Sequence, residues 1–375
     1  MPSTSQPKNT PIYFYSPCFP DNPAQLPDNV VDSWAWFYEV ARPKLGLGDG
    51  EYAWVFQTYL YLKNVISCIP TNVMPRSGIV LAHRSSIPFD LIPGAQLVLI
   101  CLQADKSPHP FAQLSVVLTE ASRYMRWTHL GDYHRPKVLW QKKRPNPNCV
   151  YIRHWPVPGL KPRLRNRRHR VENVAYLGVA HSLAAELRQP QWREDLQKLG
   201  FSWYWRNGKH LSDWNDFQEI DVIVSIRNFD DQQPGWASKP PTKLINAWHA
   251  GCFAIMGCEA SLKEVRQSEY DYIEVQSYDE ILTGLQRLRD DESLRQKMLD
   301  NGEVRAKANS IESICRDWEQ FLNSAQNYYD RWTQKSRFER YLFWLGRYFN
   351  LLIDRVQRFL YFRREGIQKR LQKLR

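Results

Sequence analysis

Short apolar runs of strand length alternate with longer helical patterns from residue 171 onward. Strand and helix alternate five times within about 110 residues, which favours a parallel sheet with helices on both faces. The expected strands are 173–177, 201–205, 221–226, 252–256 and 272–275, and the expected helices are 181–199, 242–250, 261–266 and a pair that begins at 278.

The first half of the chain has the same pattern in a less regular form. A glycine-rich stretch, LGLGDG, precedes an aromatic and apolar segment at 51–65 that is typical of a helix packed on a sheet. Apolar runs of strand length occur at 12–15, 78–83, 97–102 and 115–118. We therefore expect a second α/β domain, with no repeat of fixed period relating the two halves.

A proline-containing basic segment separates the two halves. Residues 155–170 contain three prolines, and 161–170 contain six Lys and Arg and no acidic residue. This composition predicts a domain boundary. We expect an N-terminal domain at 1–160, a basic linker at 161–172 and a C-terminal domain at 173–330.

The last segment, 331–375, has no strand pattern, and its apolar residues recur every three or four positions from Phe338 to Phe359. It holds 13 basic and 3 acidic residues, whereas the other 330 residues are nearly neutral, with 38 and 36. We expect a basic amphipathic helix. It favours an anionic membrane surface, and the alternatives are a coiled coil or a helix that crosses back to the first domain.

Composition bounds the setting of the protein. The chain of 375 residues has a net charge of +12 and seven cysteines without a C-x-x-C pair, which favours a reducing compartment. Its start lacks a signal-peptide pattern, and no run reaches about 18 apolar residues. We expect a cytoplasmic protein, peripheral at the cytoplasmic membrane face. Nucleic acid is not expected as a partner, because the tail's aromatics lie on its apolar face.

The most informative motif is KPPTKLINAWHAGCFAIMGCEASLKE at 239–264, after a strand that ends at Arg227. The two prolines suit a helix entrance, and Thr242 is a good N-cap. First-turn amides and partial positive charge at this end suit a diphosphate, with Lys243 as a point charge and Arg227 as a fork. The alternative is an ordinary helix start with a solvated lysine.

This block resembles the donor-site segment of GT-B glycosyltransferases, particularly the nucleotide-sugar-dependent "group 1" set. The resemblance spans about residues 171–325 and is fainter in the first half, in GDGEYAWVFQTYLYL and GIVLAH. It implies an α/β fold of two Rossmann-like domains facing a cleft, here with a C-terminal amphipathic helical extension. The resemblance makes 1–160 the acceptor-side domain and 173–330 the nucleotide-sugar-binding domain.

The resemblance also implies roles for single residues. Gly178, Arg227, Thr242 and Lys243 match donor-binding positions, and Asn246 would contact the ribose. Gly48 and Gly50 match the glycine-rich loop of the cleft. His83 matches a histidine that faces the reacting sugar at the end of a strand.

One departure concerns a pair of glutamates that many members carry eight residues apart. Ser238 and Asn246 stand at these positions here. Asn246 can still bond a ribose hydroxyl, but Ser238 cannot replace the charge of a carboxylate. A catalytically inactive GT-B-like protein that binds a nucleotide or sugar is therefore the alternative function.

The expected activity is transfer of a sugar, such as a hexose, from a nucleotide sugar to a glycan or lipid-linked acceptor. Cations at the departing diphosphate would stabilise its growing charge, with no cofactor and no metal. No D-x-D pair occurs in a suitable loop, and Asp230-Asp231 reads as a solvated turn. Asp105, with His109, is the candidate that acts on the acceptor hydroxyl, and the alternative is a cap or turn role.

Overall fold

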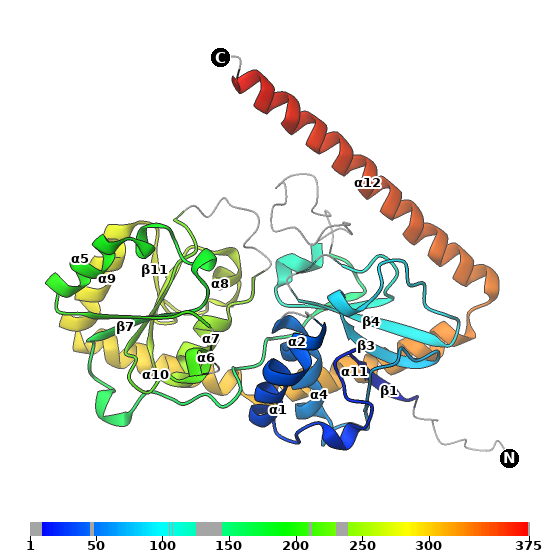
Figure 1. The fold of residues 1–375 in the computed structure, drawn as a ribbon, viewed down its shortest axis with the longest axis horizontal. Coiled ribbons are helices and arrows are strands. Elements are labelled where there is room, and N and C mark those ends of the chain that lie inside the picture. Colours follow the sequence, from blue (N-terminus) through cyan, green and yellow to red (C-terminus); the bar gives the residue numbers. More distant parts are fainter. Residues whose placement is uncertain are drawn as a thin grey trace. The chain divides into compact units, whose positions relative to one another are not determined.

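The computed structural model describes residues 10–45, 49–104, 106, 108–124, 145–208, 210, 212–229 and 239–373. The chain divides into two compact units, each with its own sheet (Figure 1). Unit 1 comprises Met1–Asn29, Trp36–Ile152 and Asp317–Arg375, and unit 2 comprises Val30–Ala35 and Arg153–Arg316. The expected α/β architecture with two parallel sheets and a C-terminal helix is confirmed. In sequence, the units meet at Ile152 and Arg153, and the basic segment 161–172 belongs to unit 2.

The unit 1 sheet has six strands in the order β2-β1-β3-β4-β5-β6, and all neighbours are parallel. The four strands expected from apolar runs are present, whereas β2 and β6 were not predicted. Both are three-residue strands at the sheet's edges, and β2 contains Pro70, which is tolerated at an edge. The strands are β1 (Ile12–Tyr15), β2 (Ile69–Thr71), β3 (Gly78–His83), β4 (Leu97–Ala104), β5 (Leu114–Val117) and β6 (Cys149–Tyr151).

The helix expected at 51–65 is present as a helical segment at 49–62, with one π-type stretch. Stacked and edge-on contacts of Phe37, Tyr52 and Phe56 pack this segment in the core. The helices of this region are α1 (Val30–Trp36), α2 (Arg42–Leu45), α3 (Asp49–Glu51) and α4 (Gln57–Leu62), with π-helical segments at Phe37–Ala41 and Tyr52–Phe56 and 3-10 turns at Pro23–Gln25, Arg84–Ser86 and Glu120–Tyr124.

The unit 2 sheet has five parallel strands in the order β11-β10-β9-β7-β8. All five predicted strands are confirmed, and each boundary lies within one residue of the prediction. Alternate residues of the central strands enter two separate apolar cores, one on each face of the sheet. The strands are β7 (Asn173–Leu177), β8 (Ser202–Arg206), β9 (Val222–Ser225), β10 (Phe253–Gly257) and β11 (Ile273–Val275).

Helices cover both faces of this sheet, as expected. One core takes side chains from α5, α9 and α10, and the other takes them from α7 and α8. The predicted helix at 181–199 is wrong in its first part, where 3-10 turns occur at Ala180–Ser182 and Glu186–Arg188. Gln189 is extended before Pro190, so the α-helix begins at the proline. The helices are α5 (Pro190–Lys198), α6 (Ser212–Asn215), α7 (Thr242–Ala250), α8 (Ala260–Val265), α9 (Tyr278–Asp290) and α10 (Glu292–Ala308).

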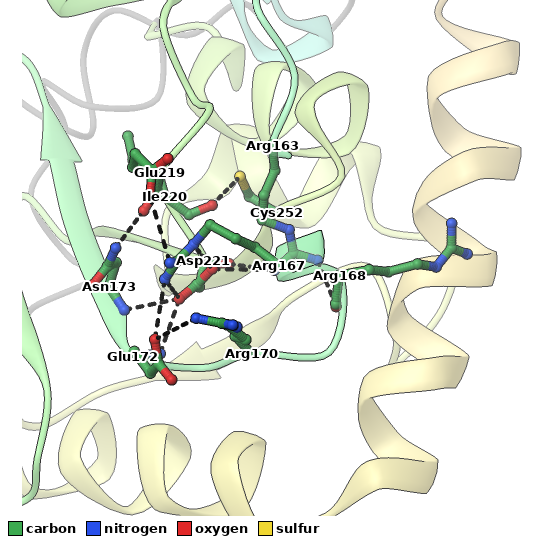
Figure 2. Close-up of polar contacts among 10 residues, drawn as sticks. All are labelled: Arg163, Arg167, Arg168, Arg170, Glu172, Asn173, Glu219, Ile220, Asp221 and Cys252. Atoms are coloured by element: carbon green, nitrogen blue, oxygen red, sulfur yellow. Dashed lines mark hydrogen bonds and ion pairs between the residues drawn. The ribbon is translucent and has the colours of Figure 1, made fainter. Parts of the chain in front are cut away.

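A buried ionic network fixes the basic segment 161–172 to the amino end of the unit 2 sheet (Figure 2). Asp221, which is fully buried, accepts hydrogen bonds from Arg167 at 3.0 and 2.7 Å. It also accepts the backbone amides of Glu172 and Asn173 at 3.0 and 2.9 Å. Arg163 lies 3.9 Å from the same carboxylate. The basic cluster seen in the sequence is therefore partly neutralised inside unit 2.

Two helices, α11 (Ile311–Gln334) and α12 (Arg337–Lys373), complete the described chain. Figure 1 shows α12 as one long continuous helix, drawn in orange and red. The predicted C-terminal amphipathic helix is thus present, and its first residues belong to α11. Of the helices in the described ranges, none is long and apolar enough to cross a membrane.

Both sheets share a strand order that determines where a ligand can bind. In each unit the first strand lies between the second and the third, and the later strands continue beyond the third. The connections therefore diverge at β1/β3 in unit 1 and at β7/β9 in unit 2. The space beyond the carboxyl ends of such a strand pair is the usual ligand site of open α/β sheets.

Candidate functional site

A pocket of about 220 Å³ lies in unit 2 beyond the ends of β7 and β9. Its position matches the point where the strand order reverses, so the topology and the cavity identify the same place. Three of the predicted donor residues from α7, together with Arg227, line it. The lining residues are Leu177, Trp214, Phe217, Ile223, Arg227, Pro240, Thr242, Lys243 and Asn246.

The amino end of α7 opens onto this pocket. Thr242 is the first helical residue, and Pro241 occupies the N-cap position without a side-chain bond, so the predicted capping role of Thr242 is wrong. The helix has the predicted bounds, but Pro240 and Pro241 take the entrance positions, so Thr242 lies inside the helix. Leu244 and Ile245 donate the first backbone bonds, both to Pro241 O, at 3.0 and 3.1 Å. The amides of Thr242 and Lys243 thus precede this ladder, where a helix favours an anion.

Lys243 is only partly exposed, and its ammonium lies 5.3 Å from the centroid of the Tyr176 ring. Burial lowers the pKa of Lys243 from 10.5 to about 7, and the positive charges of Arg227 and Lys239 add to this effect. Glu259 acts in the opposite direction. The alternative of a solvated lysine therefore does not describe this side chain. Its protonated form is disfavoured by burial and would be stabilised by an anion in the pocket.

Arg227 follows β9 and forms an ion pair with Glu259, a residue that the sequence reasoning did not identify. The side chains of Arg227 and Glu259 are 10% and 3% exposed. Glu259 follows β10 and is the N-cap residue of α8. Among the residues that the structure describes, Glu259 Oε1 has no hydrogen-bond partner. The one sequence signal for Glu259 is an acidic residue directly after a buried strand.

Gly178 directly follows β7, and its small size is required. Its φ of +151° lies in a region that favours glycine, and a Cβ would lie 2.8 Å from Tyr176 Oη and 3.2 Å from Lys243 Cε. Its carbonyl accepts a hydrogen bond from Trp205 Nε1 at 2.9 Å. Any side chain here would displace Lys243 or Tyr176.

Asn246 lines the pocket but already has a structural role. Its Oδ1 accepts the backbone amide of Val157 at 3.1 Å, and the residue is 7% exposed. The carbonyl oxygen is therefore engaged, which leaves the amide group to face a ligand. Ser238, the other position of the expected glutamate pair, lies outside the described residues, as do Asp230 and Asp231.

Trp214, on α6, adds an aromatic wall to the pocket that the sequence reasoning did not identify. Its indole Nε1 donates to Gly208 O at 3.3 Å, and a Cβ at Gly208 would lie 2.3 Å from Trp214 Cζ2. The ring is partly exposed. A flat, oriented indole beside a cationic pocket can stack on a planar ring.

Unit 1 has a second polar cluster at its own point of strand reversal. His83 ends β3, and its Nδ1 lies 3.2 Å from Glu51 Oε2 and 3.3 Å from the backbone amide of Ser85. Ser86 Oγ donates to Glu51 Oε2 at 2.6 Å. The side chains of Glu51 and His83 are 0% and 4% exposed. Nδ1 donates to Glu51 when it carries a proton and accepts from Ser85 when it does not.

The other edge of the His83 ring faces the glycine that the sequence singled out. A Cβ at Gly50 would lie 2.8 Å from His83 Nε2, so only glycine fits here. Within the described part of the chain, His83 Nε2 and Glu51 Oε1 have no hydrogen-bond partner. Glu51 was not predicted, although it directly follows the glycine-rich loop.

The charge of Glu51 affects two more residues near the end of β1. The pKa of the Cys18 thiol is raised to about 11, first by burial and then by Glu51. The pKa of Tyr15 is raised by the same two causes in the same order. Tyr15, Cys18, Glu51 and His83 thus form one cluster at the carboxyl end of β1 and β3.

The remaining acceptor-side predictions divide into two groups. Gly48 and Asp105 lie outside the described residues. His109 is fully buried, its Nε2 bonds Pro88 O at 2.8 Å, and its Nδ1 accepts the amide of Phe111 at 3.2 Å. Burial lowers the pKa of His109 to about 4. Both ring nitrogens are occupied, so His109 has the structural role that was the alternative.

Among the residues that the structure describes, no group of three or more His, Cys, Asp or Glu side chains is arranged to hold a metal ion.

Comparisons with known proteins give similarity in three dimensions only. No protein-family model matches the sequence, and no curated protein does. The crystal structure of Anabaena Alr3699/HepE in complex with UDP and glucose matches with a TM-score of 0.47 and 8% identity, over 84% of this chain and 100% of that one. TarM matches at 0.45 and 11% identity, over 71% and 58%. Sucrose-phosphate synthase from Thermosynechococcus elongatus matches at 0.42 and 12% identity, over 66% and 73%. All three TM-scores are below 0.5, so the α/β architecture is assigned from the order and direction of the strands themselves.

Proposed function

We propose that the protein is a GT-B-type glycosyltransferase that binds a nucleotide-sugar donor in unit 2. The observation that carries the proposal is the convergence of Arg227, Lys243 and the amino end of α7 on one pocket at the strand reversal. The resemblance of 239–261 to a donor-site segment selects a nucleotide sugar among phosphate-containing ligands. The diphosphate would lie against α7, and Trp214 would stack on the base.

The proposed chemistry is electrostatic. As the glycosidic bond to the diphosphate breaks, negative charge grows on the departing oxygen, and preorganised cations and amides lower the barrier. Lys243 and Arg227 supply these cations, and Glu259 holds Arg227 in place. Bringing an anion to Lys243 restores the charge that burial disfavours. We propose that no metal is required, which a chelator in the turnover assay tests directly.

We propose that unit 1 provides the acceptor side, with His83 facing the reacting groups. A proton on Nδ1, donated to Glu51, leaves Nε2 as the acceptor atom of the ring. Glu51 is then a positioning residue, and Gly50 lets the backbone approach Nε2. The acceptor class that we propose is a glycan or a lipid-linked saccharide. The seven cysteines are thiols and not disulfides in the structure, which supports a cytoplasmic location.

The second candidate is an inactive member that binds a nucleotide or sugar without turnover. It is favoured by one observation, since Asn246 Oδ1 is engaged by Val157 and a carboxylate is missing from that position. Glu259 argues for activity instead, because it supplies a buried carboxylate to the same site.

Titration calorimetry with UDP and GDP tests the donor site. The proposal expects one nucleotide to bind and Lys243→Met and Arg227→Ala to weaken it about 10-fold or more. Lys198→Met, at an exposed lysine of α5, is the matched control and should bind normally. Equal binding by all four proteins, or no binding of either nucleotide, would refute the donor site.

Release of nucleoside diphosphate from a panel of sugar nucleotides separates the two candidates. Turnover that survives EDTA supports a metal-independent transferase. Tight binding with no turnover on any donor and acceptor pair supports the inactive binder.

A further inference from the structure

Helix α12 has two apolar sides, and unit 1 covers only one of them. On the covered side, Trp344 contacts Phe111 and Trp332 with ring centroids 6.2 and 5.4 Å apart, and Leu351 is 3% exposed. Arg347 on the same side is 8% exposed. These contacts attach the first half of the helix to unit 1.

The other side carries a continuous apolar stripe in solvent. Its members recur at helical spacing between residues 338 and 360, which at 1.5 Å per residue is a length of roughly 35 Å. Each is between 48% and 67% exposed. Soluble proteins rarely expose a contiguous apolar patch of this extent without a partner. The stripe consists of Phe338, Tyr341, Leu342, Tyr348, Phe349, Ile353, Val356, Phe359 and Leu360.

Positive charge accompanies the stripe. The sequence from 337 to 373 holds ten Lys and Arg against three Asp and Glu, and seven of the ten follow residue 354. Arg355 and Arg363 are exposed. An apolar stripe beside basic side chains matches a surface that has a hydrocarbon interior and anionic groups at its boundary.

We propose that α12 binds flat on an anionic lipid surface, with the stripe in the boundary between headgroups and acyl chains. Charge decides between the occupants, because a second copy of this helix would bring two strongly basic segments together, whereas anionic headgroups neutralise them. Tyrosines and phenylalanines along the stripe suit the interfacial region. The proposal stands independently of the activity proposed above.

Flotation of the full chain with vesicles tests the proposal. Vesicles of phosphatidylcholine with phosphatidylglycerol should bind the protein, and vesicles of phosphatidylcholine alone should bind it at least ~10-fold less, because they lack the anionic headgroups that attract the basic residues. Raised salt should weaken the binding. The double variant Phe349→Gln and Val356→Gln should lose binding by at least ~10-fold. Glutamine favours helix, so circular dichroism should be unchanged.

Val304→Gln is the matched control, because Val304 on α10 is 65% exposed and lies in unit 2. This variant should bind vesicles like the parent. Equal binding by the double variant, or equal binding to both vesicle types, would overturn the proposal. A dimer in light scattering that the double variant converts to a monomer, with no vesicle binding by the parent, would assign the stripe to a second copy of the chain instead.

Discussion

Donor affinity should fall as the pH rises above neutrality, because the cation that would hold the diphosphate is Lys243. In the free protein the pKa of this lysine is about 7, lowered mainly by burial and then by Arg227 and Lys239. A bound diphosphate is negative and raises the same pKa. Above about pH 7, ligand binding is therefore accompanied by proton uptake at Lys243. Because protons become scarcer as the pH increases, the affinity for the ligand falls.

The size of the effect follows from the two protonation states. If the bound lysine stays charged throughout, the protonated fraction of the free lysine sets the affinity. That fraction falls from about 0.9 at pH 6 to about 0.03 at pH 8.5, which weakens binding about 30-fold, or about 2 kcal/mol. Near pH 8, about 0.9 protons should enter with each ligand.

Calorimetry with a nucleoside diphosphate sugar is the appropriate assay. Each phosphate of such a ligand carries one ester and one anhydride bond, so it has no second acidic proton and does not titrate in this range, unlike the terminal phosphate of free UDP. Repeating the titration in two buffers of different ionisation enthalpy gives the proton count directly. Lys243→Arg keeps its charge and should show a flat profile, and Lys243→Met should be weak and flat.

An affinity for the parent protein that stays constant from pH 6 to 8.5 would refute the reasoning. So would a pH dependence that persists in Lys243→Met, because another group would then be the one that titrates. In either case the lysine would not be the cation that meets the ligand.

Three further changes test other parts of the structure. Asp221→Asn should lower the free energy of unfolding by about 3–5 kcal/mol in denaturant titration, because buried Arg167 loses its charged partner; a loss near zero would contradict the role of the network. Gly178→Ala should weaken nucleotide binding about 10-fold or more in calorimetry, since its Cβ meets Tyr176 and Lys243; unchanged affinity would show that the site adjusts freely. Glu51→Gln should reduce kcat about 10²-fold and leave nucleotide affinity unchanged, with Glu51→Asp partly restoring kcat; equal loss of binding would mean a structural role alone.

The three central strands of unit 2, β7, β9 and β10, could be predicted from the sequence because each is an apolar run buried on both faces. No such signal marks β2 and β6, which have three residues each. They form strands by pairing with β1 and β5, which lie far from them in the sequence. The helix predicted at 181–199 fails for a local reason. Its apolar spacing continues across Pro190, but the extended residue before the proline prevents a helix from doing so.

The candidate site was predictable only in part. Arg227, Lys243 and His83 follow strands or open a helix, and those positions are visible in a sequence. Glu51 contacts His83 and Glu259 contacts Arg227, and in each pair the two residues are 32 positions apart in the chain. The roles of the two glutamates therefore depend on contacts that the local sequence does not show. Nothing local distinguishes these glutamates from solvated ones, so they appear only when the fold brings each pair together.

Two buried arginine–carboxylate pairs at opposite ends of the unit 2 sheet, Arg167–Asp221 and Arg227–Glu259, show which one serves the site. At the amino end of the sheet, both oxygens of Asp221 accept hydrogen bonds, from Arg167 and from two backbone amides. This carboxylate therefore has a structural role, because it holds the basic segment 161–172 against the strands. At the carboxyl end, Glu259 binds Arg227, yet its Oε1 has no partner among the described residues. A buried charge with an unused oxygen costs stability unless a ligand satisfies it. The Arg227–Glu259 pair lies at the carboxyl end of the sheet, where the strand order reverses, and the Arg167–Asp221 pair lies at the amino end. The energetic cost of the unpaired carboxylate oxygen therefore falls at the place where a bound ligand can offset it.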